Sequence, residues 1–181
     1  VSFGEGSDGT SNVNVSGDGS VLDAGGQFSM GGGTNNTSIL TIANGGMVKT
    51  VANEDTVDLS SSVFLGTTAA TGSTVAVNLN NSLPGVNPPQ SRIDSAAAIW
   101  VGGTFGGDPA ELTLGVPTTI TGQANTQLRY AIQLYLAPGS TITTAGTFQY
   151  TGLLSDGGGT FFDDVATITG ARRAVSSQGN S

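Results

Sequence analysis

The chain has 181 residues, of which 29 are Gly, 10% are charged and 36% are apolar, and this composition argues against helical bundles and coiled coils. Thirteen acidic residues against five basic ones give a net charge of -8, which would repel a phosphate backbone, so nucleic-acid binding is not expected. Because Cys and His are both absent, disulfide frameworks, Ser-His-Asp catalysis and the usual zinc, copper or iron centres are excluded.

No apolar run approaches the roughly 20 residues that cross a bilayer, and no charged-then-apolar signal peptide opens the chain. We therefore expect no membrane span, and we expect that any leader has been removed. The abundance of Gly, Thr, Ser and Asn with few Lys is similar to the composition of bacterial extracellular surface proteins. An extracellular or cell-surface location is the expectation that follows.

A triplet of the form apolar-x-apolar, followed by a small residue, recurs along the chain. The alternation predicts short strands with apolar side chains on one face, and the small residue predicts a sharp turn after each strand. Successive small residues, at positions 4, 31, 66, 102 and 137, are 27, 35, 36 and 35 residues apart. The copies are Val1–Gly4, Phe28–Gly31, Val63–Gly66, Ile99–Gly102 and Leu134–Ala137.

A second apolar pair follows each triplet at a nearly constant offset, and a third apolar position follows six residues later in four copies. The pairs are Val13 and Val15, Leu40 and Ile42, Val75 and Val77, Leu112 and Leu114, and Phe148 and Tyr150. The third positions are Val21, Val48, Leu83 and Ile120. Three longer segments are expected to be loops outside the repeat: Thr50–Ser62, Gly85–Ala98 and Gly122–Tyr130.

This repetition predicts an all-β fold, a parallel β-solenoid of about five coils over residues 1–160. Stacking of the coils would place Phe28 over Phe3 and Val63 over Phe28, which builds a continuous apolar core. Residues 161–181 depart from the repeat and are expected to form a terminal strand and a polar tail. An antiparallel β-sandwich of about ten strands is the alternative, because turns such as Asn44-Gly45 also suit hairpins.

Two family resemblances accompany these patterns. Segments Val13–Ser20, Gln27–Gly33, Ile39–Val48, Val63–Gly66 and Thr71–Val77 resemble the Gly-rich β-helix repeats of bacterial autotransporter passengers and related surface proteins. That resemblance implies a secreted or surface-displayed β-helix for adhesion or matrix building, without catalytic residues. Segments Thr119–Ala124 and Ala145–Tyr150 resemble the closing strands of spore-coat-like, chaperone-assembled pilins, incomplete β-sandwiches that donate a strand to a neighbour, although the cysteines of that family are missing.

Carboxylates are the only candidate catalytic groups, and only Glu54-Asp55 and Asp163-Asp164 form tight pairs. Most of the others lie in Gly-flanked turns, where Asp is favoured for its local hydrogen bonds. We therefore assign no catalytic residue and expect a protein that is not an enzyme and has no built-in metal site or cofactor. Loosely bound calcium stays open at Asp8, Asp18 or Asp156.

The middle positions of three triplets hold aromatic residues, Phe64, Trp100 and Tyr135. Stacking in register would give an exposed aromatic ladder, our candidate ligand-binding face for a surface glycan or a partner. The alternative is that a loop or a second subunit covers this face. Ice binding would need regular Thr-x-Thr rows, and since Thr41 and Thr113 are isolated, that function is not expected.

A solenoid exposes unpaired backbone groups and a section of its core at each end. The first triplet begins at Val1, so no polar cap is visible before it, while Arg172 and Arg173 lie near the opposite end. We predict head-to-tail self-association through Val1 and Phe3 at one end and the two arginines at the other. The function expected is that of a structural or adhesive subunit of a surface fibre; the alternatives are a strand-donating pilin-like subunit and a polysaccharide-binding β-helix.

Overall fold

The computed structural model describes residues 1–51, 61–67, 71–85, 88–105, 112–123, 126–130, 134–137, 139–144, 148–151, 166–170 and 175–176. These residues form an all-β fold in which three sheets contain parallel strands. Sheet A consists of β1 (Ser2–Phe3), β4 (Phe28–Met30), β7 (Val63–Leu65), β10 (Ile99–Val101) and β15 (Leu134–Leu136). The expected all-β class is confirmed.

The other two parallel sheets have six strands each. Sheet B consists of β2 (Thr10–Ser16), β5 (Thr37–Ala43), β8 (Thr74–Asn80), β13 (Thr118–Gly122), β16 (Ser140–Thr144) and β18 (Ala166–Gly170). Sheet C consists of β3 (Val21–Asp23), β6 (Met47–Lys49), β9 (Ser91–Ser95), β14 (Thr126–Tyr130), β17 (Phe148–Thr151) and β19 (Val175–Ser176). A separate hairpin, β11 (Gly103–Phe105) and β12 (Leu112–Leu114), is antiparallel.

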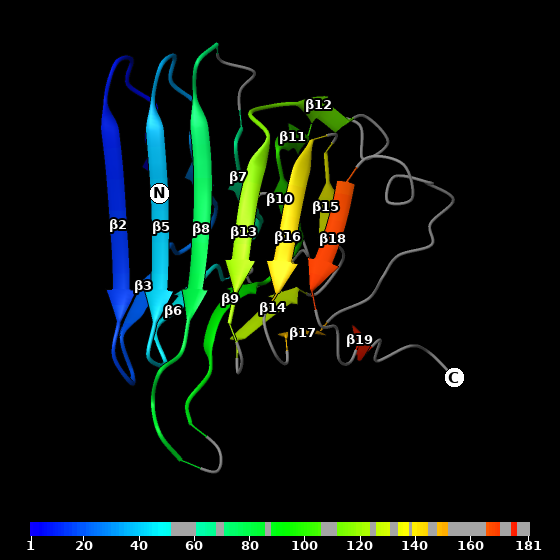
Figure 1. The fold of residues 1–181 in the computed structure, drawn as a ribbon. Coiled ribbons are helices and arrows are strands. Elements are labelled where there is room, and N and C mark those ends of the chain that lie inside the picture. Colours follow the sequence, from blue (N-terminus) through cyan, green and yellow to red (C-terminus); the bar gives the residue numbers. More distant parts are fainter. Residues whose placement is uncertain are drawn as a thin grey trace.

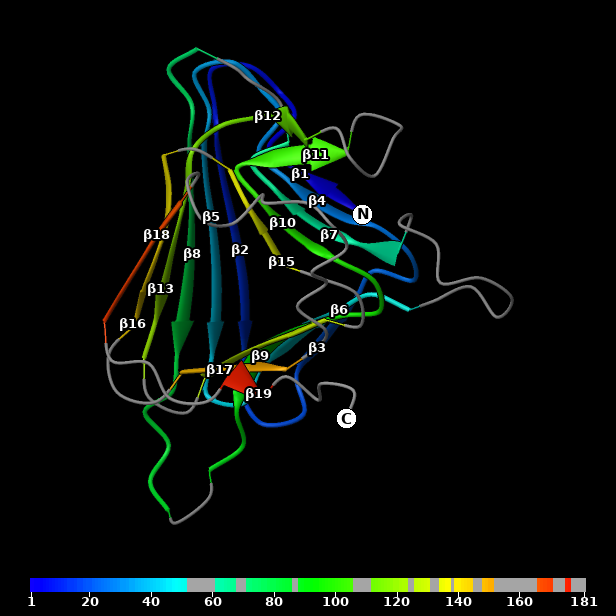
Figure 2. The same cartoon turned by 90° about the vertical axis from the view of Figure 1, so that its right-hand side faces the viewer.

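The chain visits sheets A, B and C in turn, and each strand pairs with the strand of the same sheet from the previous circuit. The three sheets surround a triangular interior, as Figure 2 shows, and Figure 1 shows sheet B in front with β2 at one edge and β18 at the other. This arrangement is compatible with a parallel β-solenoid. The antiparallel sandwich is wrong, because neighbouring strands within all three sheets run in the same direction.

The recurring glycine marks the corner between sheets A and B. Gly4, Gly31, Gly66 and Gly102 have φ values of 73°, 78°, 78° and 80°, in the left-handed region that residues with a Cβ avoid. The corner stacks like the strands: the Gly66 amide donates to the Met30 carbonyl at 2.7 Å, and the Gly102 amide donates to the Leu65 carbonyl at 2.7 Å. The triplets are therefore strands followed by a turn, as the sequence predicts.

Inward-facing side chains from all three sheets form one continuous core. Fully buried members include Met30 and Leu65 from sheet A, Leu40, Ile42 and Leu79 from sheet B, and Val48, Ile93 and Leu128 from sheet C. Each strand is too short to bury much alone, so the core exists because successive circuits lie on one another.

The predicted stacking is right for one contact and wrong for another. Phe28 pairs with Val63, as expected, but Phe3 pairs with Met30 rather than with Phe28. The Phe3 and Phe28 rings still touch, with centroids 5.9 Å apart, because both point into the same core.

The register of sheet B also differs from the prediction at its third strand. Val13 pairs with Leu40 and Val15 with Ile42, as expected. Leu40, however, pairs with Val77, two residues further along β8 than predicted. The third circuit has two more residues between its corner glycine and its strand, since Val75 lies nine residues after Gly66 whereas its partner Ser38 lies seven after Gly31.

The predicted second pairs of the last two copies are wrong. Leu112 and Leu114 belong to the β11–β12 hairpin, and Ile120 from β13 takes their place in sheet B, opposite Val77. Phe148 and Tyr150 belong to sheet C, where Tyr150 pairs with Leu128. The hairpin adds residues between a corner and the next strand, so a constant offset selects the wrong segment.

Three further expectations fail in sheet C. Val21 is an outward, exposed residue and its neighbour Leu22 pairs with Val48, while Leu83 lies outside the strands. The predicted loops Gly85–Ala98 and Gly122–Tyr130 contain strands β9 and β14.

The apolar pattern does not identify strands β9 and β14, because half of their inward positions are Ser or Thr. Ser91 is buried and donates to the Asn80 carbonyl at 2.6 Å; Ser95 is buried and donates to the Ala98 carbonyl at 2.8 Å. Thr126 is buried as well, and its hydroxyl donates to the Gln123 carbonyl at 2.7 Å. Buried hydroxyls that bond to backbone carbonyls thus replace apolar residues next to Ile93 and Leu128.

The segment 161–181, expected to hold a terminal strand and a polar tail, contributes β18 and β19 to the edges of sheets B and C. The rest of that segment, including Arg172 and Arg173, lies outside the described residues. Most of the predicted loop Thr50–Ser62 lies outside them too.

Candidate functional site

The predicted aromatic ladder exists, but it is buried. Strand pairing places Phe64 beside Trp100 and Trp100 beside Tyr135. The Phe64 and Trp100 ring centroids lie 6.1 Å apart and those of Trp100 and Tyr135 lie 3.8 Å apart, with both pairs stacked. The exposed fractions are 5%, 0% and 4%, which corrects the expectation of an exposed face. We call these three residues the aromatic column.

The aromatic column is buried within a single copy of the chain. Its strands β7, β10 and β15 are buried on both faces, so their outward side chains are shielded from solvent as well as their inward ones. Stacked aromatic rings add about 0.5–1.5 kcal/mol per pair beyond the area that they bury. The column therefore contributes to stability and offers no open surface on which a sugar ring could stack.

Burial of Tyr135 has a consequence at alkaline pH. Desolvation raises the pKa of its hydroxyl above the ordinary value of 10.0. The stability linked to Tyr135 is present below that value and is lost as pH rises above it, because the unfolded chain ionises first. We expect Tyr135→Phe to lose less stability than the wild type between about pH 9 and pH 11, measured as the midpoint of urea unfolding. Equal losses of stability in Tyr135→Phe and the wild type would show that ionisation of Tyr135 does not cause the alkaline loss.

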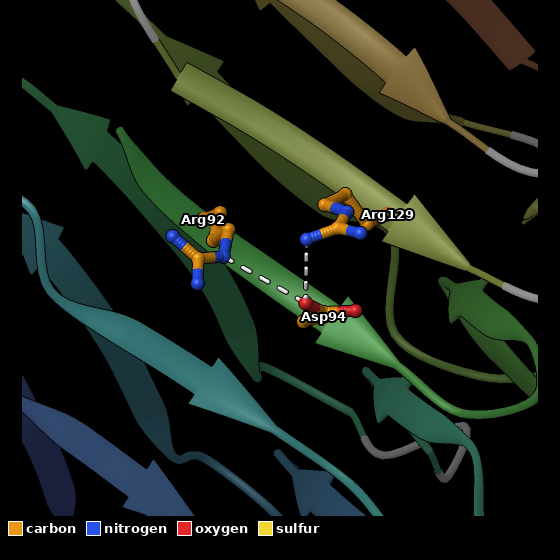
Figure 3. A network of polar contacts seen from close by, with 3 residues as sticks. All are labelled: Arg92, Asp94 and Arg129. Carbon is orange, nitrogen blue, oxygen red and sulfur yellow. Dashed lines mark hydrogen bonds and ion pairs between the residues drawn. The ribbon is translucent and has the colours of Figure 1, made fainter. Parts of the chain in front are cut away.

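The outer face of sheet C carries ion pairs, two between neighbouring strands and one within β9. Asp23 and Lys49 lie 2.8 Å apart, and Asp94 contacts Arg129 at 3.1 Å and Arg92 at 3.7 Å (Figure 3). The hydrogen bond from Lys49 lowers the pKa of Asp23 below its ordinary value of 3.8, and the Gly25 amide lowers it further. This contribution to stability is present above the ordinary value and is lost as pH falls.

The network around Asp94 is expected to add little stability, because the three side chains keep between 28% and 46% of their surface exposed. Asp94→Asn should lower the free energy of unfolding by about 0–1 kcal/mol, a difference that shrinks in high salt. Urea unfolding of both proteins at low and high salt measures this. A loss well above that range would show that the network has a role beyond strand pairing.

The outer face of sheet B has a different chemistry, and we call it the Thr–Asn face. All of its described side chains are at least partly exposed, and none is charged or aromatic. The outward residues are Thr10, Asn12, Asn14 and Ser16 on β2; Thr37, Ile39, Thr41 and Ala43 on β5; Thr74, Ala76, Asn78 and Asn80 on β8; Thr119 and Thr121 on β13; and Thr141 and Thr143 on β16.

Regular Thr-x-Thr rows, which the sequence analysis did not find, are present on this face. Thr119 and Thr121 pair with Thr141 and Thr143, and the backbone of β18 continues both rows with Thr167 and Thr169. The signal in the sequence is the tripeptide Thr-Ile-Thr, which occurs three times. The tripeptide alone does not reveal a row, because the row appears only when β13 and β16 are placed side by side in one sheet.

The carboxylates do not assemble a site within the described residues, where no group of three or more His, Cys, Asp or Glu residues could hold a metal ion. Asp8 accepts a hydrogen bond from the Asn35 side chain at 3.0 Å, and Asp18 is exposed in the turn before β3. The remaining calcium candidate, Asp156, and both paired clusters, Glu54-Asp55 and Asp163-Asp164, lie outside the described residues.

Within the part of the chain that the structure describes, the edge formed by β1, β2 and β3 is open, because each of these strands pairs on one side only. Phe3, Val13 and Leu22 pack against the core there but remain partly exposed. Val1 and Val21 are 50% and 46% exposed. This open edge contains two of the predicted self-association residues, Val1 and Phe3.

Among the described residues, no helix is long and apolar enough to cross a membrane. Comparisons of the chain with family models, curated proteins and solved structures find no match.

Proposed function

We propose that the chain is a parallel β-solenoid of about five coils that associates with copies of itself, end to end. In this proposal it is a non-enzymatic, extracellular structural or adhesive subunit of a surface fibre or matrix. The observation that supports it best is the open edge of β1, β2 and β3. At this edge all three parallel sheets present unpaired backbone groups around a partly uncovered core.

Such an edge favours another layer of strands. The backbone amides and carbonyls on the outer sides of β1, β2 and β3 have no strand partner among the described strands, and β2 offers seven consecutive residues. Unpaired strands at a sheet edge are templates for further pairing. A second copy that placed its last strands here would continue three sheets at once and would bury Phe3, Val13 and Leu22.

Charge supports a head-to-tail orientation. Four acidic residues, Glu5, Asp8, Asp18 and Asp23, lie exposed on the first circuit, close to the open edge. Two copies that met through the same edge would bring these carboxylates together, and like charges across an interface oppose association. We therefore propose that the far end, where β18 and β19 are the last strands of sheets B and C, meets the acidic end; Arg172 and Arg173 lie between these two strands in the sequence.

Sedimentation velocity across a dilution series tests the association. The wild type is expected to form particles larger than a monomer that dissociate on dilution. Leu22→Lys places a charge in the uncovered part of the core and is expected to yield a folded monomer, because inward-pointing charges block edge pairing. The matched control is Val21→Lys on the same strand, whose side chain points outward, and it should associate like the wild type.

A wild type that is monomeric at every concentration would contradict the proposal. So would a Leu22→Lys protein that keeps its fold, by far-ultraviolet circular dichroism, and still associates. Strand donation of the pilin type has no support in the described residues, where the segment resembling a closing strand, in β13, lies between parallel neighbours β8 and β16.

A further inference from the structure

The Thr–Asn face is a two-dimensional grid set by strand pairing. Neighbouring strands in a sheet lie about 4.8 Å apart, and residues two apart on one strand lie about 6.7 Å apart. The register keeps the outward positions in continuous rows across the strands. One row contains Asn14, Thr41, Asn78, Thr121 and Thr143, and its neighbour contains Asn12, Ile39, Ala76, Thr119 and Thr141.

Neighbouring Thr side chains are aligned across the strands. The hydroxyl oxygens of Thr119 and Thr141 lie 3.5 Å apart, and those of Thr37 and Thr74, in a third row, lie 3.4 Å apart. A branched Cβ restricts χ1, so each Thr presents its methyl and hydroxyl groups in few orientations. On β13 and β16 the four Thr residues therefore repeat a methyl group and a hydroxyl group at fixed intervals, with little conformational freedom left to lose on binding, and β2, β5 and β8 extend the same rows mainly with Asn, Ile and Ala.

The Thr–Asn face is also chemically distinct from the rest of the surface. It carries no charge among its described side chains, whereas the outer face of sheet C carries Asp23, Lys49, Arg92, Asp94 and Arg129. No element crosses in front of the six strands in Figure 1. A face that is uncharged and periodic suits a ligand that is itself uncharged and periodic.

We propose that the Thr–Asn face binds the surface of an ice crystal. The two grid spacings are close to the oxygen–oxygen repeats on planes of hexagonal ice, so the rows can match ordered water in two directions at once. Hydroxyl groups hydrogen-bond to this water, and methyl groups between them occupy its gaps. Each contact is weak, and binding depends on many matched positions acting together.

The composition of the face favours ice over a polysaccharide. Flat polysaccharide surfaces are commonly recognised by exposed aromatic rings that stack on the sugars, and in this protein the aromatic column lies buried on sheet A. The described Thr–Asn face has hydroxyl, amide and aliphatic groups only, without an aromatic ring. This inference goes beyond the proposed self-association, because the face covers the side of the stack and not its ends.

Thermal hysteresis of the purified chain, the gap between the melting and growth temperatures of a seeded ice crystal, tests the proposal. The wild type is expected to shape the crystal and to produce a measurable gap. Thr121→Tyr places a large ring in the middle of the grid and is expected to abolish most of the gap, and Thr119→Tyr should act likewise. Val21→Tyr, at an exposed position of sheet C, is the control and should retain the full gap.

The conservative variants separate the two groups of the side chain. Thr121→Val keeps the methyl groups and Thr121→Ser keeps the hydroxyl, so a partial loss in each is expected if both groups contact ice. Circular dichroism confirms that every variant is folded. Absence of thermal hysteresis and of crystal shaping in the wild type would overturn the proposal, as would full activity of folded Thr121→Tyr.

Two further measurements keep the outcomes distinct. Sedimentation of the wild type with crystalline cellulose or chitin, lost in Thr121→Tyr and without any effect on ice, would overturn the ice proposal and identify a polysaccharide as the ligand. Monomeric Leu22→Lys is expected to retain crystal shaping, because its substitution lies at the open edge. A protein that does not self-associate can therefore still shape ice crystals, and a protein without any effect on ice can still self-associate.

Discussion

Trp100→Ala is expected to lower the free energy of unfolding by about 3–5 kcal/mol, the range found when buried aromatic residues are truncated. Trp100 has no exposed surface and is stacked between Phe64 and Tyr135. Its removal would leave a cavity in the middle of the aromatic column and would end both stacking contacts. Urea unfolding followed by circular dichroism measures the loss.

Tyr135→Phe is the control for the Trp100→Ala variant. Tyr135→Phe keeps the ring and should retain most of the stability at neutral pH. The hypothesis of an exposed aromatic ladder predicts the opposite pattern for Trp100→Ala, namely unchanged stability with reduced retention on a glycan array. That result would show that the column is open in solution and would restore glycan binding as its function.

Gly66→Ala is expected to lower the free energy of unfolding by about 2–6 kcal/mol, from two effects of similar size. The first is backbone strain, because φ at Gly66 is 78°. The second is a steric clash, since a Cβ on Gly66 would lie 2.3 Å from the Val116 carbonyl oxygen and 2.5 Å from the Thr118 hydroxyl. Thermal and urea unfolding of the variant measure the sum.

Two other glycines separate these effects. Gly19 has a φ of 77° and open space around its Cα, so Gly19→Ala reports the strain alone, about 1–2 kcal/mol. Gly6 lies outside the left-handed region and has open space, so Gly6→Ala should change stability by no more than about 0.5 kcal/mol. Equal losses in Gly66→Ala and Gly19→Ala would show that the corner relaxes around the added methyl group.

The sequence predicts sheet A well, because its strands combine two local signals. Each triplet has alternating apolar residues, and in four of the five copies the triplet is followed by a glycine with positive φ at the corner, whereas Ala137 follows the fifth. Together they locate β1, β4, β7, β10 and β15 with the correct register, apart from the Phe3 contact. The all-β class and the parallel pairing follow from the repetition of these five units.

Sheets B and C are harder to predict, because the segments that lead to them vary in length. The β11–β12 hairpin moves Ile120 away from its expected offset, and half of the inward positions of β9 and β14 are Ser or Thr. A buried hydroxyl that bonds to a carbonyl has the same sequence signature as an exposed one. The pattern of apolar residues alone therefore leaves these strands among the predicted loops.

The surfaces are the least predictable part, since exposure depends on segments far away in the chain. The alternation places Phe64, Trp100 and Tyr135 outward and in register, but it cannot show that other segments cover them. The Thr-x-Thr rows depend on aligning β13 with β16, which needs the correct strand assignment first.

The base of the β11–β12 hairpin shows how this architecture accepts additional chain. The Gly115 amide donates to the Gly102 carbonyl at 2.9 Å, and the Val116 amide donates to the Gly66 carbonyl at 3.1 Å, so the backbone returns to its corner after the excursion. Strands β10 and β13 on either side keep their pairing with β7 and β8. The hairpin is therefore a suitable place to insert a foreign peptide or a small tag. The hydrogen bonds at its base and the pairing of β10 and β13 do not depend on the residues inside the hairpin.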